Sequence, residues 1–234
     1  MDHETARHDR PPRSDGWAFL REAARDMRTT GAVAPSGRGL AHALSEPACA
    51  PAHGPATVLE AGAGTGVVTS ALLSRLPRGS RLDVVEANPR FADRLQRLAD
   101  RHRQDGKEVR LHLRPVEEVE TDRSYDAVVS GLPFANFAPR HVATVMERYL
   151  ELLRPGGTLT YFAYLGTLPA SALFASRNRT RRHRAVEEVL AGYRRSYATG
   201  CRTVWPNLPP ARVWQLRRPA PAAPAPRREA VAVG

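Results

Sequence analysis

The sequence has little lysine, little cysteine and no metal-ligand spacing. Lys107 is the only lysine among 35 basic residues, so arginine carries almost all of the formal net charge of +11. Cys49 and Cys201 lie far apart and outside any C-x-x-C spacing, which gives no indication of a disulfide framework or a zinc site. The eight histidines are scattered without the spacing of metal ligands. We therefore expect no metal ion and a reducing, cytoplasmic compartment.

Targeting and membrane-spanning patterns are also missing. The amino terminus begins with charged residues and lacks the apolar core of a secretory signal. Residues 155–176 carry no charge and are long enough to span a bilayer, but Pro155, Gly156, Gly157, Gly166 and Pro169 interrupt them. Residues 158–164 alternate as a strand does. This stretch predicts a buried strand, a loop and a helix start.

The high arginine content has two explanations. A GC-rich genome would enrich arginine, alanine and proline together without selection for charge. Alternatively, the charge attracts a polyanion, either a lipid surface or a nucleic acid. Both explanations stay open. The length of 234 residues suits one α/β domain with appendages.

Three glycines at alternate positions follow the first apolar run. Residues 57–59 lead to Glu60, and Gly62, Gly64 and Gly66 come before apolar spacing resumes. This pattern predicts a strand, a tight turn and a helix, as in the first crossover of a nucleotide-binding sheet. The spacing differs from the G-x-G-x-x-G of dinucleotide sites, and Glu60 would repel a phosphate. The expected ligand is a cationic or zwitterionic nucleoside such as S-adenosylmethionine; an ordinary tight turn is the alternative.

A second acid supports the nucleoside interpretation. The apolar run 82–85 ends in Glu86, twenty residues beyond Gly66. An acid at the end of the second strand of such a unit accepts hydrogen bonds from ribose hydroxyls. The alternative is a solvated acid in a loop.

Strands and helices alternate along most of the chain. We predict helices over 37–44, 88–103 and 139–153 and another through 186–193, and strands over 57–59, 82–85, 109–113, 126–130, 158–164, 202–205 and 212–216. This order predicts an α/β fold with an open, mostly parallel, doubly wound (Rossmann-like) seven-stranded sheet, an antiparallel edge hairpin, and helices on both faces.

The ends of the chain differ in composition from its middle. Residues 1–14 and 218–234 are too polar or proline-rich to order, whereas 46–217 form the predicted main domain. Residues 15–28 predict an amphipathic helix with an arginine-edged apolar face, which suits an anionic bilayer; packing on the domain is the alternative. Residues 15–45 are thus predicted to form N-terminal helices, with a membrane as a possible contact.

The order of elements and four motifs resemble the class I S-adenosylmethionine-dependent methyltransferases. The motifs are E-A-G-A-G-T-G at 60–66, V-V-E-A-N-P at 84–89, S-G-L-P-F at 130–134 and R-P-G-G-T-L at 154–159. Residues 19–22, 30–36, 130–133 and 205–213 are most similar to bacterial phospholipid N-methyltransferases, which methylate phosphatidylethanolamine. The resemblance covers about residues 17–217 and implies a cytoplasmic enzyme peripheral to the inner face of the membrane. It also implies that the helices of residues 15–45 help the enzyme settle on the membrane and cover the cofactor site.

The resemblance implies a cofactor site at the strand ends. Glu60, Gly62 and Gly64 would shape the methionine end, Glu86 would hold the ribose, and Ala87 would lie beside the adenine. Arg114-Pro115-Val116 stands where the superfamily often has an acid, so the backbone of Val116 takes the place of that contact. The predicted cofactor-binding set is Glu60, Ala61, Gly62, Ala63, Gly64, Gly66, Glu86, Ala87, Val116 and Ser130.

The resemblance also implies where the methyl acceptor lies. Gly131, Leu132, Pro133 and Phe134 would present an amine nitrogen to the methyl group. Tyr164 and His141 are candidates to assist removal of its proton, with structural roles as the alternative. The rings of Phe134 and Phe137 would stabilise the alkylated cation.

Three acceptor classes are compatible with this site. The ribosomal RNA adenine dimethylases carry asparagine at the position of Gly131, and its loss removes a hydrogen bond to a flipped base. This difference favours an ethanolamine phospholipid on an anionic membrane over RNA. A soluble metabolite amine and an RNA adenine N6 atom remain the alternatives, and the sequence does not indicate an oligomeric state.

Overall fold

The computed structural model describes residues 37–50, 54–102, 105–121, 124–165, 177–207 and 209–220. The predicted tail 1–14 and the predicted helix 15–28 lie outside these residues. So do the predicted loop and helix start within 166–176 and most of the predicted tail 218–234. Within the described part of the chain, none of the helices is both long enough and apolar enough to cross a membrane.

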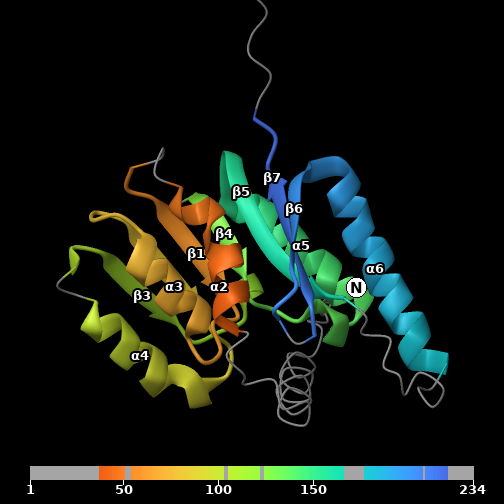
Figure 1. Cartoon of the computed structure of the whole chain (residues 1–234), viewed down its shortest axis with the longest axis horizontal. Helices are drawn as coiled ribbons and strands as arrows, with labels where there is room; N and C mark the ends of the chain where they lie inside the picture. Colours follow the sequence, from red (N-terminus) through yellow and green to blue (C-terminus); the bar gives the residue numbers. More distant parts are fainter. Residues whose placement is uncertain are drawn as a thin grey trace, which may run out of the picture.

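A seven-stranded sheet forms the centre of the molecule, in the order β3-β2-β1-β4-β5-β7-β6 (Figure 1). The strands are β1 (Thr57–Ala61), β2 (Arg81–Val85), β3 (Glu108–His112), β4 (Tyr125–Ser130), β5 (Leu153–Tyr164), β6 (Ala198–Val204) and β7 (Ala211–Arg217). The first five pair in parallel, and β7 is antiparallel to both β5 and β6. The predicted mostly parallel sheet with an antiparallel edge hairpin is confirmed. Its order reverses between β1 and β4, and ligands of open α/β sheets bind at the carboxyl ends of the strands where the order reverses.

Helices cover both faces of the sheet, as predicted. The helices are α2 (Gly37–Ser45), α3 (Val67–Arg75), α4 (Ala92–Arg101), α5 (Pro139–Leu152) and α6 (Arg177–Tyr197). Short 3-10 turns are η1 (Pro47–Cys49), η3 (Pro89–Phe91), η5 (Val116–Glu118) and η6 (Phe134–Asn136). Helices α2, α3 and α4 pack on one face, and α5 and α6 pack on the other (Figure 1).

The two helical layers follow from the two-residue period of the strands. In β1, Val58 packs in the α2–α4 layer and Leu59 packs in the α5–α6 layer. In β4, Val129 packs in the α2–α4 layer and Val128 packs in the α5–α6 layer. The layers are unequal in one place. Between β3 and β4, the described residues form only the short turn η5, so no α-helix of this crossover covers the α5 side of β2 and β3.

Several boundaries differ from those predicted. The helix predicted over 88–103 starts as η3, where the Asn88 side chain accepts a hydrogen bond from the Arg90 N–H, and α4 ends at Arg101. Strand β5 begins at Leu153 rather than at 158, with Gly156 at a φ of +77° where its register against β4 shifts. The last helix and both hairpin strands are longer than predicted. The additional residues of these elements have a weak local sequence pattern, and their contacts with the rest of the fold extend the helix and strands.

A buried ion pair lies within the α5 side of the sheet. Arg81 donates hydrogen bonds to both carboxylate oxygens of Asp83 at 3.0 and 2.9 Å, and the Tyr125 hydroxyl donates one at 2.6 Å. Burial alone would raise the pKa of Asp83, but His112, Arg81 and Tyr125 together lower it to about 2. The carboxylate is therefore ionised throughout the physiological pH range.

Replacing Asp83 with asparagine is expected to destabilise the protein by about 3–5 kcal/mol, because the buried Arg81 cation loses its counterion. Since the pKa of Asp83 is lowered in the folded state, its contribution is present above pH 4 and is lost as the pH falls towards 2. Urea unfolding should therefore show a weaker acid dependence in the variant. The exposed Asp93→Asn is the control; equal unfolding midpoints for the two variants would contradict the prediction.

Candidate functional site

The carboxyl ends of β1, β2 and β4 meet at the glycine loop. The Gly62 and Ala63 N–H groups donate to the Val85 carbonyl oxygen at 2.9 and 3.3 Å, and the Gly131 N–H donates to that of Ala61 at 2.8 Å. These bonds fix the loop against both neighbouring strands. The loop runs through positive φ angles of 75° at Gly62, 52° at Gly64 and 80° at Gly66, which other residues rarely adopt. Gly66 then caps α3.

The loops after β1 and β4 are in direct contact. A methyl group at Gly131 would lie 2.6 Å from the carbonyl oxygen of Gly62. A methyl group at Gly62 would lie 2.4 Å from Cδ2 of Leu132. Position 131 has no room for a side chain, and the positive φ of Gly62 disfavours one there. The missing side chain that the sequence shows at position 131 therefore reflects a close approach between two backbones.

Glu60 is a buried acid at this junction. Its exposed fraction is 0%, and neither carboxyl oxygen has a hydrogen-bond partner among the described residues. Burial raises the pKa of Glu60 to about 8; nearby Thr69 opposes the rise, and the neighbouring Glu86 adds to it. At neutral pH a buried carboxyl group of this kind is mostly protonated, and a cation that enters beside it favours its ionisation.

Glu86 faces the same loop from the end of β2. Its carboxylate accepts hydrogen bonds from the N–H groups of Gly64 and Asn88, each at 2.7 Å. Burial raises the pKa of Glu86, and these backbone donors oppose the rise. A carboxylate has about four acceptor positions, so acceptor capacity remains for hydroxyl donors. The backbone N–H of Glu86 donates to the His112 carbonyl oxygen at 3.0 Å, which brings the buried Ala87 to the end of β3.

The segment after β4 is anchored beneath the sheet. The Ser130 hydroxyl accepts hydrogen bonds from the Tyr149 hydroxyl at 3.0 Å and from the Leu132 N–H at 3.3 Å. Pro133 then leads into η6. Ser130 is fully buried, and its contacts point into the α5–α6 layer. Its hydroxyl therefore shapes the loop, whereas Leu132 and Pro133 remain half-buried at the edge.

Phe134 and Phe137 are core residues. They are 2% and 1% exposed, with ring centroids 6.2 Å apart, and Phe134 packs edge-on against Tyr161 at 5.8 Å. This burial argues against direct contact between either ring and a substrate cation. The aromatic cluster supports the loop from below.

The two predicted proton acceptors lie in opposite layers. Tyr164 ends β5 and packs edge-on against Phe162 in the α2–α4 layer, where burial raises the pKa of its hydroxyl. His141 lies in the first turn of α5, with Nε2 3.2 Å from Oε1 of Glu117. Val116 is buried in the same layer as α5, next to Glu117. The structure therefore groups His141 with Val116 and separates both from Tyr164.

Sequence reasoning missed three polar residues of this region. Thr69 is buried beside Glu60, and its position in the first turn after the glycine loop is a usable signal. Tyr149 and Glu117 contact Ser130 and His141 from distant parts of the chain, so their spacing gave no signal.

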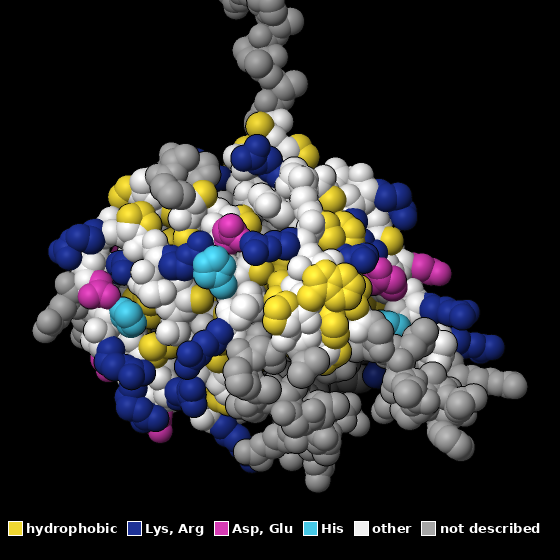
Figure 2. All heavy atoms as spheres, viewed as in Figure 1, with side chains coloured by type: hydrophobic (Ala, Val, Ile, Leu, Met, Phe, Trp, Pro, Cys, Tyr) yellow, Lys and Arg dark blue, Asp and Glu magenta, His cyan; other side chains and the backbone are white. Residues whose placement is uncertain are grey.

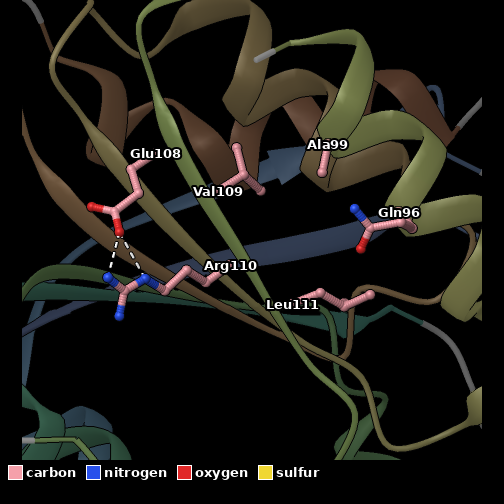
Figure 3. A pocket seen from close by; sticks show the side chains of 6 residues that line it. All are labelled: Gln96, Ala99, Glu108, Val109, Arg110 and Leu111. Carbon is pink, nitrogen blue, oxygen red and sulfur yellow. Dashed lines mark hydrogen bonds and ion pairs between the residues drawn. The ribbon is translucent and has the colours of Figure 1, made fainter.

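Two hollows lie outside the strand junction. One of about 340 Å³ lies between α4 and β3, and Figure 3 shows Glu108 paired with Arg110 along it. None of its six lining residues belongs to the predicted site. The second, of about 380 Å³, opens beside Thr65 and Gly66 between α2, α3 and α4. Arg38, Arg94 and Arg101 contribute to its lining.

Residues 59–159 match the family model described as a methyltransferase domain. The ornithine lipid N-methyltransferase of Singulisphaera acidiphila is 33% identical over 104 residues, which are 43% of this chain and 54% of that protein. The chain thus matches about half the length of this curated relative.

Two solved structures share the fold. The N-methyltransferase NodS of Bradyrhizobium japonicum superposes with a TM-score of 0.57 at 18% identity, over 80% of this chain and 98% of that one. The 1,6-didemethyltoxoflavin-N1-methyltransferase of Burkholderia thailandensis, with its substrate and S-adenosylhomocysteine bound, gives 0.59 at 21% identity, over 91% and 93%. At these identities the likeness concerns the fold.

Proposed function

We propose that the chain is an S-adenosylmethionine-dependent methyltransferase that methylates the amine headgroup of a phospholipid at a membrane surface, since residues 59–159 match a methyltransferase domain. The observation that carries the methyl-transfer proposal is the buried, unpartnered carboxyl group of Glu60 beside the glycine loop. The lipid acceptor rests on the partial match to a lipid N-methyltransferase and on the arginine-borne charge.

The residues at the strand ends fit the cofactor. Glu60 would become ionised beside its cationic methionine end, and the backbone of Gly62 and Gly64 would border that end. Glu86 has acceptor positions left for the ribose hydroxyls, while Ala87 and the backbone of Val116 would border the adenine. The other members of the proposed set, Ala61, Ala63, Gly66 and Ser130, hold the loop in shape.

S-adenosylmethionine supplies a methyl group already activated on a sulfonium, so the chain mainly needs to orient the acceptor. Gly131, Leu132 and Pro133 would hold the amine through backbone groups, and proximity of this kind is worth about 7–11 kcal/mol when the geometry is right. The amine must also lose a proton. We propose His141, held by Glu117, for this step, because the raised pKa of Tyr164 keeps its phenol protonated.

An RNA acceptor is less compatible with the loop contact. An asparagine at position 131 would have to displace the carbonyl oxygen of Gly62, since even a methyl group would lie 2.6 Å from it. Because position 131 is glycine and the contact leaves no space for asparagine, a flipped adenine would find no side-chain hydrogen-bond acceptor at this position.

Incubation with methyl-labelled S-adenosylmethionine tests the proposal. Label is expected in phosphatidylethanolamine vesicles and not in ethanolamine, other small amines or RNA. His141→Gln should lower kcat by about 10²-fold or more, the contribution typical of acid–base catalysis, without changing cofactor affinity. Thr144→Ala, an exposed change one turn further along α5, is the matched control. Label in a soluble amine alone would contradict the lipid acceptor, and absence of cofactor binding would contradict the methyl-transfer proposal.

A further inference from the structure

The exposed large apolar side chains of the described residues all lie on the side of the sheet where the parallel strands have their carboxyl ends, which we call the carboxyl edge. They are Val67, Leu113 and Trp205, with exposed fractions of 39%, 46% and 70%. Val67 begins α3 after the glycine loop, Leu113 follows the last residue of β3, and Trp205 follows the last residue of β6. Strand β6 runs parallel to β5 because both are antiparallel to β7. All three side chains therefore lie at the carboxyl edge, where the candidate site lies.

These side chains span the width of the sheet. Leu113 and Trp205 follow the two outermost strands, which are six inter-strand spacings apart, or roughly 29 Å. Figure 2 shows hydrophobic side chains over the β6–β7 hairpin and a gathering of basic side chains over α4. Single exposed apolar residues are normal on a protein surface. Their restriction to the edge that carries the site is the feature that needs a cause.

Unpaired arginines lie at the same edge. Arg38, Arg94 and Arg140 are exposed and stand at the second or third residue of α2, α4 and α5. Among the described residues, none of the three forms an ion pair. A cation in the first turn opposes the helix dipole, by about 0.3–1 kcal/mol at exposed sites. These positions are therefore unfavourable for folding, and the approach of an external anion would compensate for them.

We propose that this carboxyl edge is a docking surface for an anionic phospholipid bilayer. Trp205, Leu113 and Val67 enter the headgroup region, where tryptophan in particular is favoured. Arg38, Arg94 and Arg140 contact lipid phosphates, for which the guanidinium fork is well suited. The proposal deepens the proposed function, on which it rests, because it places the Gly131 loop against the membrane that holds the substrate.

A bilayer fits this surface better than a polynucleotide does. Both would attract the arginines, but only a bilayer offers an environment for the exposed aliphatic side chains of Val67 and Leu113. The two partners are also separable by experiment, since RNA would compete with vesicles for the arginines alone.

Co-sedimentation of the full chain with phosphatidylglycerol–phosphatidylcholine vesicles, which contain no methyl acceptor, tests the surface. The triple variant Arg38→Gln, Arg94→Gln, Arg140→Gln is expected to lower vesicle partition at least tenfold, because each basic residue near an anionic surface contributes about fivefold. Trp205→Ser should lower it severalfold at every salt concentration. The matched control is Arg78→Gln, Arg195→Gln, Arg217→Gln, which removes the same charge from exposed positions near the amino edge and should bind as the wild type does.

Calorimetry with S-adenosylhomocysteine verifies that each variant is folded, since none of the changed residues belongs to the proposed cofactor site. Equal losses in both triple variants would overturn the proposal in favour of a general charge effect. Failure of the wild type to bind vesicles, or binding to RNA that Trp205→Ser leaves unchanged while vesicle binding is absent, would also overturn it. Because these vesicles carry no ethanolamine, a failure here is distinct from a failure to methylate lipid.

Discussion

Replacing Glu60 with glutamine is expected to stabilise the free protein at pH 8 and to weaken cofactor binding at least tenfold. The two effects have one cause, the buried carboxyl group without a hydrogen-bond partner. In the unfolded chain this group ionises near its ordinary pKa of 4.5, whereas the folded protein raises its pKa to about 8. Between these values the folded state retains a proton that the unfolded state has lost. Stability therefore falls as the pH rises through this window, by up to about 1.4 kcal/mol per pH unit, and levels off above pH 8.

Glutamine keeps the shape of the side chain but cannot ionise, so the variant should lose this pH dependence. Glutamine also cannot form the carboxylate that would stabilise the sulfonium or ammonium group of the cofactor, so cofactor affinity should fall. Urea unfolding at pH 5, 7 and 8.5 and calorimetry with S-adenosylmethionine measure the two effects. Glu188→Gln, at an exposed position of α6, is the control and should change neither. A wild-type stability that does not vary between pH 5 and pH 8 would contradict the prediction.

Replacing Gly131 with alanine is expected to have the second large effect. The added methyl group would lie 2.6 Å from the Gly62 carbonyl oxygen, which is backbone and cannot rotate away. The loops after β1 and β4 must separate, which also strains the hydrogen bond from the Gly131 N–H to Ala61. Overpacking of this kind destabilises by about 1–3 kcal/mol. Methyl transfer should fall further, since a displacement of about 1 Å in a reacting pair can reduce the rate about 100-fold.

Gly192→Ala is the matched control, because the nearest atom to a methyl group there is 4.0 Å away, within α6. It should stabilise the helix by about 0.5–1 kcal/mol and leave activity unchanged. Thermal unfolding and the methyl-transfer assay give both readouts. If Gly131→Ala retained full activity, the contact between the two loops would have no part in positioning the acceptor.

The sequence was sufficient to predict the sheet and to bring the candidate site residues to the ends of neighbouring strands. Alternating apolar runs separated by turns predicted the mostly parallel sheet and its hairpin, because burial on two faces imposes a regular pattern along the chain. The glycine spacing and Glu86 placed the loop and the acid together because parallel strands end at one edge. These are consequences of local pattern and topology.

Contacts between distant segments could not be predicted in the same way. The bond from Tyr149 to Ser130 and the pair of His141 with Glu117 depend on how α5 lies on the sheet, which periodicity leaves open. Phe134 was predicted at the acceptor site from its motif, but the turn of η6 directs its ring into the aromatic core. Strand β5 starts at Leu153 because Gly156 adopts a positive φ where the register of β5 against β4 shifts, and this pairing cannot be predicted from the local sequence.

The short third crossover has a consequence for local opening. Strand β3 is outermost and pairs with β2. It has α4 on one side, and the described residues of its own crossover form no α-helix on the other. This half of the sheet should therefore open more easily than the half built on α5 and α6, and its amide protons should exchange sooner. The proposed nucleoside contacts at Glu86, Ala87 and Val116 lie on this weaker half. A bound nucleoside would then slow amide hydrogen exchange most in this half of the sheet. Protection of the amides of β2 and β3 would therefore report how fully the nucleoside site is occupied.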